Sequence, residues 1–348
     1  MRMIGDWSDM IRHRSGSASP MVLLLLPLVA AILLIVERPP KYPVKQAPNA
    51  FQERLYGRLG AAGLSGDELA TVGALTLGYK EELDKELKRH FQASGAAHVL
   101  AVSGLHTGLI YGLLVWLLTL GGRYRPMHEN KVARRAISLV IIGVMWGYAW
   151  LTGLTPSVVR AVLMVTLVEI GKMIYRKSLT INTIAAAAVL ILIVRPTDLW
   201  SVSFQLSFAA TTAIVLMVNR LPAMLTGRIA AYFLGIIVVS VAAQLGTLPI
   251  TMFYFKQVST YFLLANLLVL PIATFLVPSG LATIALGGST AGVFIGKITW
   301  ALAWLMNHSV EWIESLPGST IPAHINGWMV GIYYILLCIL YLLVIKKA

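Results

Sequence analysis

Long apolar runs without charged residues are the feature that most constrains this chain. A bilayer core about 30 Å thick is crossed by a helix of about 20 residues, so uncharged runs of roughly 17 to 25 residues are candidate spans. Nine such runs occur, over residues 96–120, 136–152, 156–174, 179–194, 199–218, 229–254, 260–286, 291–312 and 327–345. A tenth run, 21–36, is shorter and contains Pro27. The sequence therefore predicts an all-α polytopic membrane protein with about nine to ten transmembrane helices.

Composition agrees with this fold class. Of the 348 residues, 57% are hydrophobic and 12% are charged, whereas a soluble domain carries about 25% charged residues. The single cysteine, Cys338, cannot form an internal disulfide or a cysteine-based metal site. We expect residues 1–36 to form a cytoplasmic N-terminus and a short anchor span, with a cleaved secretory signal as the alternative.

The net charge of +13 is distributed unevenly among the loops. Twelve basic residues lie in alternate segments, namely 121–135, 172–178, 219–228 and the C-terminal tail, whereas the opposite loops hold Arg195 and Lys256. Because basic loops stay in the cytoplasm, both termini are predicted to be cytoplasmic, in a multi-pass protein of the bacterial inner membrane. The excess positive charge then sets topology and is poor evidence for an external nucleic-acid receptor.

The segment after the first run is predicted to lie outside the cell. Residues 37–50 read as a proline-rich linker and residues 51–95 as an external helical segment, and together they hold nine basic and eight acidic residues. We expect a short helical hairpin on the outer surface. Its capping and terminating residues are expected to be Ser65, Glu68, Gly78, Asp84 and Gly95.

Polar residues at membrane depth repeat at helical spacing in two runs. Polar groups there usually face a partner helix or a water-filled cavity. The run 229–254 places four of them on one face: Ser240, Gln244, Thr247 and Thr251. The run 199–218 places three on one face: Ser201, Gln205 and Thr212. Two interpretations stay open, a polar pathway and hydrogen bonding between helices.

The run 96–120 combines polar and small residues. Ser103 and His106 share a face near the outer surface and could form a nucleophile–base pair. A histidine donating to a neighbouring helix is the favoured interpretation, because neither an orienting carboxylate nor a G-x-S-x-G elbow accompanies them. Glycines at every fourth position predict a close helix–helix seam: Gly104, Gly108 and Gly112.

Two charged side chains fall within predicted spans. Arg160 lies one turn inside the helix that starts at Thr155-Pro156, where it could contact an anion such as phosphate or extend to the outer interface. Glu169 is three residues from Lys172, which favours an ion pair over a proton relay.

Other signals are absent or ambiguous. The run 291–312 fits either a span or a helix along the surface, because its outer half is polar and its tryptophans resemble interface anchors. His308 and Glu311 are too few ligands for a metal site. The stretch 292–297 has the wrong spacing for a phosphate-binding loop. We therefore expect no cofactor, no metal and no ATPase activity.

Several motifs in order resemble one family. HVLAVSGLHTG (98–108), GLTPSVVRAVLM (153–164) and PTDLWSVSFQLSFAAT (196–211) are followed by AQLGTLPI (243–250) and LLANLLVLPI (263–272). Together they resemble the membrane domain of the ComEC-type competence proteins, and the likeness extends over about residues 51–345. Residues 96–348 would then be a competence-type multi-span channel domain.

The resemblance implies an inner-membrane channel, not an enzyme, for the uptake of single-stranded DNA during natural transformation. It raises the weight of the pathway interpretation. The candidate residues lining the DNA path are Ser103, His106, Arg160, Ser201, Gln205, Thr212, Ser240, Gln244, Thr247, Thr251 and Asn266.

The chain also departs from the family pattern. Members usually carry an external OB-type domain where this chain has the linker 37–50, and many end in a nuclease-like domain whose H-x-H-x-D-H motif does not occur here. The expected partners are therefore single-stranded DNA, an external DNA receptor and a cytoplasmic ATPase or single-strand-binding protein, with homo-oligomerisation left open. The alternative functions are a secondary transporter of a small solute and an intramembrane serine hydrolase.

Overall fold

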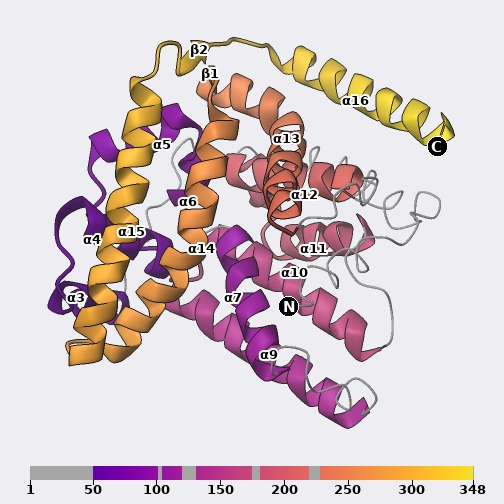
Figure 1. Cartoon of the computed structure of the whole chain (residues 1–348). Coiled ribbons are helices and arrows are strands. Elements are labelled where there is room, and N and C mark those ends of the chain that lie inside the picture. The colour runs from indigo at the N-terminus through magenta and orange to yellow at the C-terminus, as the bar shows by residue number, and fades with distance from the viewer. Residues whose placement is uncertain (1–49, 101–103, 120–130, 175–180, 219–227, 348) are drawn as a thin grey trace.

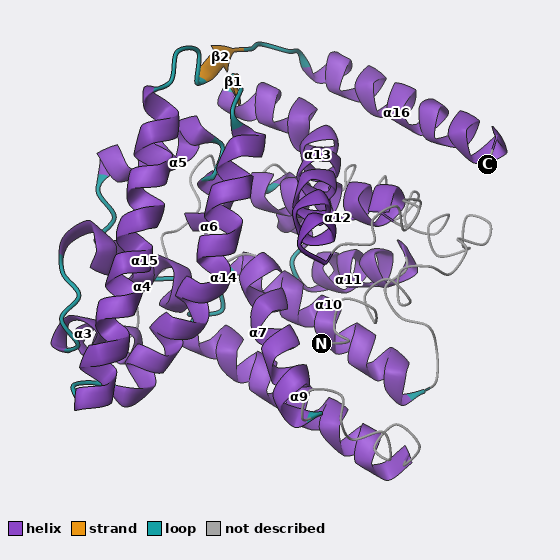
Figure 2. Cartoon of the chain, viewed as in Figure 1, coloured by secondary structure: helices purple, strands orange, loops and turns teal. Residues whose placement is uncertain are grey.

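The computed structural model describes residues 50–100, 104–119, 131–174, 181–218 and 228–347. Nearly all of these residues are helical (Figure 2), so the predicted fold class is confirmed at this level. The segments 1–36 and 37–49, for which an anchor and a linker were predicted, lie outside the described residues. The described α-helices are α3 (Ala50–Ala61), α4 (Gly66–Leu77), α5 (Lys85–Ser94), α6 (Ala97–Leu100), α7 (Gly104–Leu118), α9 (Lys131–Leu151), α10 (Pro156–Met173), α11 (Ile181–Val194), α12 (Val202–Val218), α13 (Arg228–Phe255), α14 (Phe262–Leu286), α15 (Thr290–Ser315) and α16 (Gly327–Lys347).

Each of the nine long apolar runs coincides with one of these helices or, for 96–120, with α6 and α7. Three helices in the described part are long and apolar enough to cross a membrane, over 131–151, 230–255 and 262–286. Four further apolar helices are shorter, over 106–118, 181–194, 202–218 and 327–337. The membrane character of the chain rests on these helices, and the full number of spans stays a prediction.

The segment 51–95 differs from the hairpin that was predicted on the outer surface. It forms three helices, and every residue from 70 to 77 of α4 is buried. This half of α4 shares a core with α14 and α15, and in Figure 1 α3 and α4 lie beside α15. Residues 70–77 are therefore buried rather than exposed on a hairpin, because the Ala, Val and Leu side chains of α4 form an apolar surface that packing against α14 and α15 removes from water. The external location of residues 51–95 stays a prediction.

Local signals in this segment were read correctly. Asp84 precedes α5 and its carboxylate accepts a hydrogen bond from the Glu86 N–H at 3.1 Å. Gly78 and Gly95 end α4 and α5 in the left-handed conformation, with φ of 70° and 90°, as glycine does most easily. Ser65 precedes α4, but its side chain makes no capping hydrogen bond, so only the position of the predicted capping box is confirmed.

A small antiparallel sheet joins two connections that are far apart in sequence. Strand β1 (Gln257–Ser259) follows α13, and β2 (Thr320–Pro322) follows α15. Val258 pairs with Ile321, and the Tyr261 hydroxyl donates to the Pro317 carbonyl at 3.0 Å. This sheet was not predicted, because three-residue strands leave no periodic pattern. It holds the start of the connection to α16 against the end of α13 (Figure 1).

Close helix contacts occur at glycines other than those predicted. A Cβ at Gly104, Gly108 or Gly112 would meet no heavy atom of the described chain within 4 Å, so no described helix uses the predicted seam on α7. A Cβ at Gly246 of α13 would instead lie 2.6 Å from the Ala213 Cβ of α12. The spacing of small residues marks where a helix can approach another, but the partner's position decides where it does.

Two further close contacts lie around the α3–α4 segment. A Cβ at Gly280 of α14 would lie 2.7 Å from a methyl group of Thr76, and one at Gly296 of α15 would lie 2.5 Å from the Ala62 carbonyl oxygen. Both glycines therefore let α14 and α15 approach the α3–α4 segment at backbone distance.

Candidate functional site

A buried arginine is the most unusual group in the described part of the bundle. Arg160 lies in the first turns of α10, which begins with Thr155 as N-cap and Pro156 at its first position, as the sequence predicted. The residue is 3% exposed. The alternative in which its side chain extends to the outer interface is therefore wrong, since that position would leave the guanidinium in water.

Only one of the three guanidinium nitrogens of Arg160 has hydrogen-bond partners in the described residues. Its Nη2 donates to the Ser203 carbonyl at 2.9 Å, to the Ser203 hydroxyl at 2.7 Å and to the Ser157 hydroxyl at 3.4 Å. Its Nε and Nη1 are buried and have no hydrogen-bond partner in the described part of the chain. Asp198 is near enough to interact electrostatically with Arg160, but no carboxylate of the described residues forms an ion pair with it. A buried guanidinium without an ion-pair partner is costly, and free donors of this kind suit an anion.

The predicted polar residues of α12 lie on the same helix as Ser203. Ser201, Gln205 and Thr212 are half-buried, and the Gln205 side chain donates to the Leu199 carbonyl at 3.0 Å. Ser203 itself was missed as a site residue. A serine is too common in apolar helices to stand out, and only the position of α10 against α12 identifies it.

The stripe predicted on α13 makes two kinds of contact. The Thr247 and Thr251 hydroxyls donate to carbonyls one turn earlier, at 2.8 and 3.0 Å, which satisfies them within the helix. The Ser240 hydroxyl accepts from the Asn266 amide of α14 at 3.0 Å, and both residues are buried. Gln244 is half-buried. Hydrogen bonding between helices is thus present at Ser240, as one of the two interpretations had it.

The polar stripe of α13 does not face α12. Gly246 marks the side of α13 that contacts α12. At about 100° per residue, Gln244, Thr247 and Thr251 lie roughly 100° to 160° around the helix from it. Ser240, the fourth member, faces α14. The α13 stripe therefore points toward α14, where Asn266 joins it at Ser240.

His106 and Thr107 of α7 are fully buried. Ser103 lies outside the described residues. The hypothesis of a Ser103–His106 pair therefore stays a prediction.

Glu169 forms a hub between three helices. Its carboxylate accepts from the Lys172 ammonium at 2.9 Å, as predicted, and also from the Tyr111 hydroxyl of α7 at 2.6 Å and the Ser138 hydroxyl of α9 at 2.7 Å. Glu169 is 1% exposed. Tyr111 and Ser138 were missed, because a sequence shows that a buried carboxylate needs donors but not which helices supply them. The hub holds α7, α9 and α10 together.

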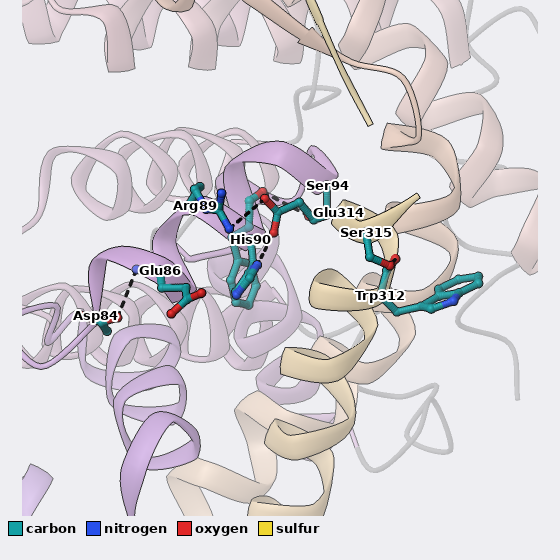
Figure 3. A network of polar contacts seen from close by, with 9 residues as sticks. Asp84, Glu86, Arg89, His90, Ser94, Trp312, Glu314 and Ser315 are labelled. Atoms are coloured by element: carbon teal, nitrogen blue, oxygen red, sulfur yellow. Dashed lines mark hydrogen bonds and ion pairs between the residues drawn. The ribbon is translucent and has the colours of Figure 1, made fainter. Parts of the chain in front are cut away.

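A second polar region joins α5 to α15. Figure 3 shows His90 and Arg89 of α5 turned toward Glu314 near the end of α15, with contacts to both carboxylate oxygens, at 3.4 Å for Arg89. A cavity of about 250 Å³ opens beside His90. Its acidic lining residues are Asp67, Glu68, Asp84, Glu86 and Glu311.

Four of those five carboxylates belong to the starts of α4 and α5, where negative charge stabilises a helix. In the described ranges, no cluster of three or more His, Cys, Asp or Glu side chains is arranged to hold a metal ion. The acidic lining of the cavity is therefore accounted for mainly by the starts of these two helices.

Comparison with known proteins places most of the chain in one group. A family model described as "Competence protein" matches residues 75–347. That range covers α5 to α16 with the buried arginine, both polar stripes and the Glu169 hub. No solved structure matches the chain.

Individual relatives are more distant. The chain is 29% identical over 245 residues to ComE operon protein 3 of Bacillus subtilis (strain 168), covering 69% of this chain and 30% of that protein. It is 26% identical over 269 residues to the uncharacterised protein YcaI of Escherichia coli (strain K12), covering 75% of this chain and 34% of that protein. The chain thus spans about a third of the length of these relatives.

Proposed function

The chain belongs to the competence protein family, and from that premise we propose that it is an inner-membrane channel through which single-stranded DNA enters the cell during natural transformation. We further propose that it is not itself an enzyme. The resemblance of its motifs to the ComEC-type proteins, and the relationship to ComE operon protein 3, support this function.

The observation that carries the proposal is that the Nε and Nη1 donors of Arg160 have no hydrogen-bond partner in the described residues. A phosphodiester brings one negative charge and two oxygens that can accept hydrogen bonds. The free Nε and Nη1 donors of Arg160 offer such an anion a charged partner at the edge of the buried region, next to the exposed Ser203. In that site a charged hydrogen bond is stronger than in water. We propose that Arg160, with Ser157 and Ser203 beside it, contacts the backbone of the passing strand.

The rest of the proposed path is uncharged. The polar residues of α12 and the stripe of α13 with Asn266 present hydroxyl and amide groups rather than ammonium or guanidinium groups. Each phosphate that is paired with a cation adds affinity, whereas conduction requires sites that release what they bind. A single arginine among neutral polar groups suits a polyanion that must both enter and leave.

The proposed topology has nine to ten spans and both termini in the cytoplasm. Contact with α14 supports a spanning α15 over a surface helix, because the two helices run side by side (Figure 1). Pulling the strand inward requires energy. We propose that a separate cytoplasmic ATPase or single-strand-binding protein supplies it near the basic loop 121–135, and that another protein receives DNA outside the cell.

The test is transformation frequency in a strain lacking the gene, complemented with the full chain. Arg160→Gln is expected to lower the frequency at least tenfold at normal protein level, because glutamine keeps polarity but loses the charge. Arg195→Gln, which changes an exposed arginine, is the matched control and should behave as the unaltered chain does. Normal transformation in the deletion strain would refute the proposed function, and normal transformation with Arg160→Gln would refute the assignment of this residue.

A further inference from the structure

A proline interrupts α13 beside the polar stripe. Pro249 lies inside this helix, and proline has no N–H to donate to the carbonyl four residues earlier. The carbonyl of Leu245 therefore lacks its helical partner. Proline also bends a helix, and Figure 1 shows that α13 changes direction along its length.

Two consecutive tyrosines of α16 bind carbonyls at this interruption. The Tyr333 hydroxyl donates to the Leu245 carbonyl at 2.9 Å, which is the carbonyl that proline leaves without a donor. The Tyr334 hydroxyl donates to the next carbonyl, of Gly246, at 2.7 Å. Adjacent residues of a helix point about 100° apart, so the two side chains can reach neighbouring carbonyls of a crossing helix.

Little else in the described bundle holds α16. Its main contact is with α13, and in Figure 1 it extends away from the other helices. Trp328, Ile335 and Leu336 are 65%, 60% and 59% exposed. Both tyrosine hydroxyls thus bind at the turn of α13 where Pro249 leaves the Leu245 carbonyl without its helical donor.

The part of α13 that precedes the proline is held against α12. Gly246 lies against α12, where even a methyl group would be 2.6 Å from the Ala213 Cβ. Movement at the proline therefore involves the part of α13 that follows it, from Pro249 to Phe255, together with the β1–β2 sheet at its end.

We propose that α16 sets the bend of α13 through these two hydrogen bonds, so that Tyr333 and Tyr334 are positioning residues for the polar stripe. Gln244 and Thr251 lie on either side of Pro249, and the bend determines whether they continue one surface. That consequence for DNA rests on the proposed function, whereas the control of the bend by α16 does not. The segment after Pro249 is about 9 Å long, so a 20° change of bend displaces its end by about 3 Å.

The experiment is a distance measurement by double electron–electron resonance on the full chain in detergent. Spin labels are placed at the exposed positions Phe255 and Ile193 in a Cys338→Ala background. The double variant Tyr333→Phe/Tyr334→Phe is expected to shift or broaden the distance by about 3 Å. Ser309→Ala removes a hydroxyl–carbonyl bond within α15, and it should leave the distance unchanged.

Pro249→Ala separates control of the bend from simple attachment of α16. Alanine restores the N–H that the Leu245 carbonyl needs, so the tyrosine substitutions should cause no further shift in this background. An unchanged distance in the tyrosine variant, or an equal shift with and without Pro249, would overturn the proposal. If the double variant yields no folded protein, Tyr333→Phe alone is measured with the same two criteria. If the tyrosine variant shifts the spin-label distance but transforms normally, control of the bend by α16 is supported and the proposed DNA path along the polar stripe is contradicted.

Discussion

The contact between α12 and α13 at Gly246 makes a quantitative prediction. In Gly246→Ala the new methyl group would lie 2.6 Å from the Ala213 Cβ and 2.7 Å from the Ala209 carbonyl oxygen. Carbon atoms pack at about 3.5 to 4.0 Å, so the helices must separate by about 1 Å. Overpacking of this kind costs about 1 to 3 kcal/mol.

The same substitution elsewhere on α13 gives the control. A Cβ at Gly235 would meet no atom within 4 Å in the described chain, and alanine is preferred to glycine in a helix by about 1 kcal/mol. Gly235→Ala should therefore be neutral or stabilising. The two variants are expected to differ by about 2 kcal/mol or more, which corresponds to about 4 °C in the unfolding midpoint of a chain of this size.

The assay is thermal unfolding in detergent, with the folded fraction followed by size-exclusion chromatography at a fixed heating time. Gly246→Ala should lower the midpoint, and Gly235→Ala should keep or raise it. Equal midpoints would refute the close contact at Gly246. Gly108→Ala, on the seam predicted from sequence, should behave as Gly235→Ala does. A lower unfolding midpoint for Gly108→Ala would support the predicted seam.

Other residues give further predictions. Glu169→Ala should lower stability by about 3 kcal/mol, since it leaves buried donors unpaired, and Glu169→Gln should lower it less, as thermal unfolding of both can show. The hydrogen bond from the Glu86 backbone N–H lowers the pKa of Asp84. At pH values above the ordinary carboxyl pKa the cap therefore stabilises α5 in full, and this stabilisation is lost as the pH falls through the lowered pKa. The stability difference between the unaltered chain and Asp84→Ala, followed by hydrogen exchange of α5, should therefore shrink in acid. A topology reporter after Lys131 should read cytoplasmic and one at Gln46 external, and the reverse at either position would contradict the proposed orientation.

The sequence predicted helices better than it predicted contacts. Uncharged runs locate α9 to α16, because a helix that is apolar along its length needs no partner to be recognised. Asp84 and Gly95 locate α5, because capping depends on neighbours in the chain. The burial of α4, the seam at Gly246 and the pairing of Ser203 with Arg160 depend on which faces meet in space. One sequence with helical periodicity does not contain that information.

The burial of α4 has a consequence for how the protein is made. Thr71 of α4 donates to the Asn307 side chain of α15, 236 residues later in the chain, at 2.9 Å. Because chains are synthesised at about 5 to 20 residues per second, Asn307 is made roughly 10 to 50 seconds after α4. During this interval α4 can contact α3 and α6, but the surface that α15 covers has no native partner, so packing of this early part of the described chain is among the last to be completed. Proteases and chaperones therefore meet α4 in a newly made molecule and not in a finished one.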